Sequence, residues 1–70
     1  MTATIVRDGL VAGVTSSRIE WLRCGNSKFL PWRSTELAIP SAVACHAVKQ
    51  TGELIVACKD GMVVRVPIPA

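Results

Sequence analysis

Short apolar runs separated by turn residues occupy most of the chain. Near the N-terminal end, the runs TATIVR and LVAGVT flank Asp8-Gly9. Asp-Gly between apolar runs favours a hairpin, because a type I′ turn needs positive φ at both central residues. The next run, RIEWLR, alternates and places Ile19 and Trp21 on one face, which is typical of a half-buried strand. The pattern predicts three consecutive strands over residues 2–7, 10–15 and 18–23.

A second hairpin is predicted in TGELIVACKDGMVVRV, residues 51–66, where two apolar runs flank Asp60-Gly61. Side chains alternate between the faces of a strand. The main buried positions are therefore expected to be Leu54, Val56, Val64 and Val66. The opposite face is also largely apolar and carries Ile55, Ala57, Val63 and Arg65. We expect one face to meet the core and the other to meet a second subunit or a partner.

The middle of the chain is less regular. A short strand is expected at residues 28–30, and Pro31 either ends it or confines it to a sheet edge. We expect a loop after it that packs Phe29 and Trp32 on the core.

The stretch SAVACHAVKQ, residues 41–50, fits two structures. As a helix it has Ser41 as N-cap, Gly52 near its end, and an apolar face that includes Val43 and Ala47. As a strand it is apolar on both faces, which suits a buried strand. Local propensity favours the helix. The predicted fold is a single small domain, residues 1–70, that is mainly β: an antiparallel, hairpin-rich, blade-like sheet or barrel. The alternative is an α+β fold with one helix at about residues 41–50.

Composition adds a constraint on where apolar side chains can go. Half of the 70 residues are hydrophobic and only 19% are charged. A chain this short buries only about 60% of the surface that its unfolded form exposes, so some apolar surface should stay outside. Exposed apolar patches usually mark interfaces. We therefore expect a protein-binding module that works as a homo-oligomer or docks on a larger protein, as an adaptor or inhibitor. The expected interface residues are Ile55, Val63, Arg65 and Trp32.

The formal net charge is +3, and the eight cationic residues are scattered along the chain. One segment interleaves cations with aromatic residues, as single-strand binders do. The alternative function is therefore a small basic nucleic-acid-binding domain that uses the segment 18–33. Its candidate residues are Arg18, Arg23, Lys28, Arg33 and Trp32.

The residue types that carry chemistry are sparse. His46 is the only histidine and follows Cys45 directly, so on a strand the two side chains diverge to opposite faces. The three cysteines show no CxxC spacing and the acidic residues form no spaced pair, so no enzyme activity, metal or other cofactor is expected. No basic leader and no apolar span of about 18 residues is present. These features predict a reduced, cytoplasmic protein with no membrane segment and no evident small-molecule ligand.

The chain also contains an internal similarity. Aligning Leu10 with Leu54, an offset of 44 residues, places strand on strand and turn on turn. Periods of about 40–45 residues are typical of propeller blades. Residues 43–66 resemble the middle of a WD-type β-propeller blade, with Thr51-Gly52 and Asp60-Gly61 at the two turns. The resemblance implies a binding platform in which residues 41–48 form a strand. Because a closed propeller needs at least about four blades, it implies a fragment, a repeat that assembles with its own copies, or a blade pattern reused in another small β fold.

Overall fold

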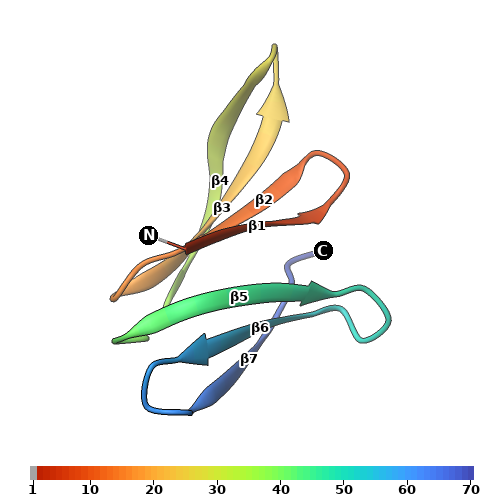
Figure 1. The fold of residues 1–70 in the computed structure, drawn as a ribbon. Helices are drawn as coiled ribbons and strands as arrows, with labels where there is room; N and C mark the ends of the chain where they lie inside the picture. Colours follow the sequence, from red (N-terminus) through yellow and green to blue (C-terminus); the bar gives the residue numbers. More distant parts are fainter. Residues whose placement is uncertain (1) are drawn as a thin grey trace.

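The computed structural model describes residues 2–70, which form seven antiparallel strands in two sheets (Figure 1). The strands are β1 (Thr2–Arg7), β2 (Leu10–Val14), β3 (Arg18–Gly25), β4 (Lys28–Glu36), β5 (Ala42–Val48), β6 (Glu53–Cys58) and β7 (Val63–Pro67). The first sheet has the order β1-β2-β3-β4 and the second the order β5-β6-β7. The mainly β fold is confirmed. The two sheets do not close into a barrel.

Tight turns connect the strands of the first sheet. The predicted hairpin forms at Asp8-Gly9, where Gly9 has φ of 77°. Asp8 does not have positive φ, so the turn is not the predicted type I′ turn, which needs positive φ at both residues. Asn26 and Ser27 both have positive φ and form the turn between β3 and β4. Asparagine is one of the few residues other than glycine that tolerates this conformation. Turn chemistry at these two places fixes an up-and-down meander.

The helix that local propensity favours at residues 41–50 is wrong, because this stretch contains strand β5. Its backbone pairs with β6 in the register Cys45↔Val56 and Ala47↔Leu54. Cys45 and Ala47 pack against the core while His46 lies on the exposed side. Pairing with β6 and burial of alternate side chains outweigh the helix propensity of the alanines, which is a weak preference.

The loop predicted after residue 30 is also wrong, because β4 continues from Lys28 through Pro31 to Glu36. Proline is tolerated there because β4 is an edge strand. Phe29 does not pack on the core, since half of its surface is exposed. Trp32 is partly buried and packs against the core, as predicted.

The core lies between the two sheets, which pack through one face each. It consists of the buried residues Val6, Leu10, Ala12, Val14, Ile19, Trp21, Ile39, Leu54, Val56 and Val66. Strands β1 and β5 lie side by side where the sheets approach each other (Figure 1). Trp21 is the largest fully buried side chain, and its indole Nε1–H donates a hydrogen bond of 2.9 Å to Thr35 Oγ1.

The hairpin of β6 and β7 forms as predicted. Leu54, Val56 and Val66 are buried and Val64 is half-buried. At the turn, Gly61 has φ of 91° and its N–H donates to the Cys58 carbonyl at 3.0 Å. Asp60 Oδ1 accepts a hydrogen bond of 3.0 Å from the Met62 N–H. These two hydrogen bonds hold the backbone of the Asp60-Gly61 turn in place.

We expect Gly61→Val to reduce the free energy of unfolding by about 1–2 kcal/mol, because a β-branched residue resists positive φ. A Cβ at Gly61 would meet no atom within 4 Å, so the loss would come from backbone strain alone. Urea denaturation measures it. Gly25→Val is the control, since its Cβ would meet only Leu30 Cδ1 at 4.0 Å and its φ is not positive. Equal losses in both variants would contradict this account of the turn.

Candidate functional site

The second sheet has one face on the core and one face outward. Cross-strand pairing aligns His46, Ile55 and Arg65 in one row. Ala44, Ala57 and Val63 form the neighbouring row. We call these six side chains the outer face. Within it Val63 is 60% exposed, and Ile55 and Ala57 are half-buried by their neighbours. A hollow of about 120 Å³ is lined by residues that include Ala44, His46, Ile55 and Ala57.

Charge lies at the margin of the outer face. Arg65 Nε is 3.8 Å from Glu53 Oε1, and the Arg65 side chain is 69% exposed. An exposed ion pair of this kind contributes roughly 0–1 kcal/mol to stability. Arg65 can therefore leave Glu53 at little cost and pair with a group on a partner.

Three of the four predicted interface residues converge on the outer face: Ile55, Val63 and Arg65. Trp32 does not, because it belongs to β4 in the other sheet. Sequence reasoning joined Trp32 to the other three by residue type, since tryptophan and arginine are enriched at interfaces. The topology separates them.

The first sheet has an apolar row that the sequence analysis missed. Ile5 pairs with Val11, Val11 with Leu22, and Leu22 with Pro31, so these four side chains cross the sheet in line. They alternate with core residues such as Ala12 and Trp21, and Ile5 is 73% exposed. The sequence did contain a sign of this row, because the runs TATIVR and LVAGVT are apolar on both faces.

The end of the β3–β4 hairpin, residues 23–33, projects from the molecule, and its tip extends beyond the last residue pair with β2, Leu10↔Arg23 (Figure 1). We call it the hairpin arm. The guanidinium carbons of Arg23 and Arg33 lie 4.9 Å and 4.7 Å from the centre of the Trp32 ring. Cations at this distance from a tryptophan ring are attracted by its electron-rich face. Phe29 and Leu30, also on the arm, are each about half exposed.

The predicted nucleic-acid residues are divided by the structure. Arg23, Trp32 and Arg33 come together on the arm, and Lys28 lies at its turn opposite Gly25. Arg18 lies at the other end of β3, where its Nε is 2.6 Å from Glu20 Oε1. A partner that binds the arm would therefore not depend on Arg18.

Cys45 and His46 lie on opposite faces of β5, since Cys45 packs against the core and His46 is exposed. Burial raises the pKa of the Cys45 thiol, which keeps it in the unreactive thiol form. Among residues 2–70, no three His, Cys, Asp or Glu side chains are placed to hold a metal ion.

No protein-family model matches the chain, and neither characterised proteins nor solved structures show significant similarity to it. Residues 2–70 include no helix that is long and apolar enough to cross a membrane.

We expect iodoacetamide at pH 8 to alkylate Cys24 on the order of ten-fold faster than Cys45. Cys24 is exposed, whereas Cys45 is half-buried and its raised pKa lowers the thiolate fraction. Peptide mass spectrometry measures both rates, and the same reaction in urea should remove the difference. Equal rates in the folded protein would contradict the placement of Cys45.

Proposed function

We propose that the protein is a non-enzymatic binding module that associates through the outer face of its second sheet. The observation that carries the proposal is an apolar sheet face that the chain itself leaves uncovered. The core already uses Leu54, Val56 and Val66 on the opposite face. Burying apolar surface is the main driving force of association, at about 25 cal/mol per Å².

Two further apolar side chains near the second sheet are exposed. Val43, where the pairing of β5 with β6 shifts register, is 58% exposed, and Met62, directly before β7, is 61% exposed. A standard interface buries roughly 800 Å² per partner, about a sixth of the 4673 Å² surface of residues 2–70. The outer face would form the apolar centre of an interface of this size.

A second copy is the favoured partner. The row Ile5, Val11, Leu22 and Pro31 gives the first sheet an apolar outward face as well. Sheets pack face to face at about 10 Å through such surfaces, so two copies can stack the first sheet of one on the second sheet of the other. Docking on a larger protein is the other form of this function.

We further propose that the binding module is built like a propeller blade, as the resemblance implies. Its support is that β1 to β4 form a four-stranded antiparallel meander, which is the unit of a blade. Strands β5 to β7 follow as three strands of the same up-and-down order. We also propose a reducing, cytoplasmic setting, which is supported by the three free cysteines.

A second candidate function is nucleic-acid binding by the hairpin arm. The observation in its favour is the placement of Arg23 and Arg33 against the Trp32 ring. Arginine and tryptophan together can hold a phosphate and stack on a base. The outer face would take no part in this activity.

For self-association, we expect Ile55→Glu and Val63→Glu to weaken the assembly by about 100-fold or more, because a carboxylate in an apolar interface loses its hydration. Sedimentation equilibrium measures the association, and circular dichroism checks the fold. Gln50→Glu, an exposed turn position off the outer face, is the matched control. Unfolding of both variants would show that the face is core, and full assembly of both would show that it is merely exposed.

For nucleic-acid binding, we expect Trp32→Ala to weaken binding to a single-stranded probe by about ten-fold, since stacking on one aromatic ring contributes roughly 1–3 kcal/mol per base. Arg23→Gln and Arg33→Gln should each lower the salt dependence of binding. Arg18→Gln is the control, because Arg18 is bonded to Glu20 away from the arm. Fluorescence anisotropy measures the affinities, and no binding at low salt would remove this candidate.

A further inference from the structure

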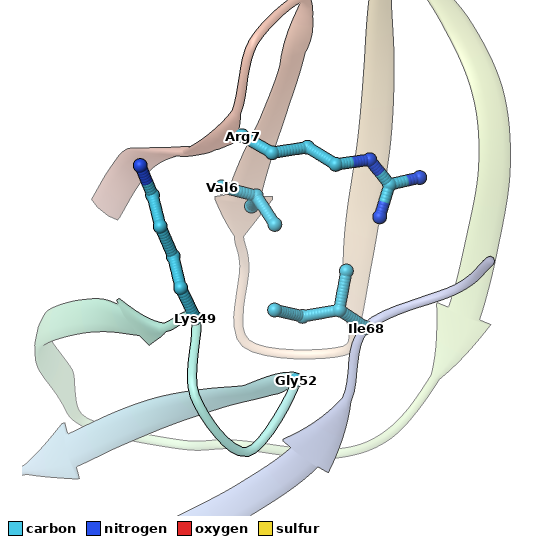
Figure 2. A pocket seen from close by; sticks show the side chains of 5 residues that line it. All are labelled: Val6, Arg7, Lys49, Gly52 and Ile68. Atoms are coloured by element: carbon cyan, nitrogen blue, oxygen red, sulfur yellow. The ribbon is translucent and has the colours of Figure 1, made fainter.

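A pocket of about 290 Å³ lies at one end of the space between the two sheets. Three separate parts of the chain line it: Val6 and Arg7 from β1, Lys49 and Gly52 from the β5–β6 turn, and Ile68 just after β7 (Figure 2). Its volume is near the lower end of the range for ligand pockets, about 300–1,000 Å³. It therefore suits a small molecule.

The register of β1 explains how neighbouring residues share this pocket. Val6 and Arg7 are consecutive, and consecutive side chains of a regular strand point to opposite faces. The pairing of β1 with β2 shifts between Ile5 and Arg7, where a bulge interrupts the ladder. A bulge redirects side chains, and bulges are frequent beside functional sites. This bulge brings a buried apolar group and a cation to the same cavity.

Backbone hydrogen bonds hold the other side of the pocket. Gly52 has φ of 69°, and its N–H donates to the Val48 carbonyl at 3.0 Å. Its carbonyl accepts a 2.9 Å hydrogen bond from the Ile68 N–H. The β5–β6 turn and the segment after β7 are thus joined to each other. The pocket is formed before any ligand arrives.

The lining combines positive charge with an apolar centre. The Arg7 side chain runs along one side of Val6 and Ile68 and the Lys49 side chain along another, with their cationic ends directed apart (Figure 2). No acidic side chain lines the pocket. The ion pairs among residues 2–70 involve Arg18 and Arg65, not these two cations. The pocket therefore has two positive groups that the described part of the chain does not neutralise.

The geometry points to a binding site for a small organic carboxylate with an apolar body. The carboxylate would pair with Arg7 or Lys49 at the rim, where charge-assisted hydrogen bonds are strong. The apolar body would cover Val6 and Ile68. A small inorganic anion would lose hydration against this apolar centre without replacing it, and a neutral hydrocarbon would leave the cations unused. None of the lining residues belongs to the outer face, so this site is independent of the proposed self-association.

The test is titration of the full-length protein with octanoate, followed by ¹H–¹⁵N correlation spectra. We expect saturable shifts at Val6, Gly52 and Ile68. Octanol, which has the same chain but no charge, should bind about ten-fold or more weakly. Arg7→Gln and Lys49→Gln should each weaken octanoate binding by about three- to ten-fold. Both residues are exposed, so the variants should keep well-dispersed spectra.

Lys59→Gln is the matched control, because Lys59 is an exposed lysine on the β6–β7 turn, outside the pocket. Unchanged affinity in this variant, together with weaker binding in the two pocket variants, would support the site. Equal affinity for octanol and octanoate would overturn it, as would equal weakening by all three substitutions. Shifts confined to Ile55 and Val63, or no saturable shift up to the solubility of octanoate, would overturn it too.

Discussion

Two sheets in one short chain present four faces, and only two of these faces can be buried against each other. The protein places Trp21, Ile19 and Leu54 between the sheets, with no surface left exposed on any of them. Trp21 also ties β3 to the edge strand β4 through its hydrogen bond to Thr35. The remaining two faces must meet water or another molecule. The exposed apolar surface of this protein follows from that limit, because half of its residues are hydrophobic.

The edges and faces of the sheets differ in what they offer a partner. An unpaired strand edge invites pairing with another chain, and proline or a bulge blocks it. Edge strand β4 carries Pro31 beside a shift in register, and edge strand β7 ends in Pro67 with Pro69 after it. Proline has no backbone N–H, so Pro31 and Pro67 each remove a hydrogen-bond donor and weaken the addition of another strand at these edges. The other two edge strands, β1 and β5, lie against each other, whereas the outward faces of the two sheets carry no such block.

Turn chemistry and alternation made much of the fold predictable. Asp8-Gly9 and Asp60-Gly61 identify two of the three hairpins that turn at a glycine of positive φ, and alternation identifies Trp21 as core. The predictions that were wrong concern elements whose structure depends on contacts between residues distant in sequence. β5 is a strand because β6 pairs with it, and β4 runs through Pro31 because only one of its edges is bonded. The same limit applies to the sites, since no local pattern shows that Trp32 lies apart from Ile55 or that Val6, Lys49 and Ile68 share a pocket.

The internal similarity at an offset of 44 residues aligns Ile19 with Val63 and Trp21 with Arg65. In the first sheet, Val14 pairs with Ile19, and the connection between them is residues 15–18. In the second sheet, Ala57 pairs with Val63, and the connection, residues 58–62, is one residue longer. A shift of one residue moves a whole strand to the other face. Ile19 is fully buried, whereas its counterpart Val63 is 60% exposed. Part of the outer face thus occupies positions that the first sheet uses for its core, which explains why an exposed face carries apolar side chains.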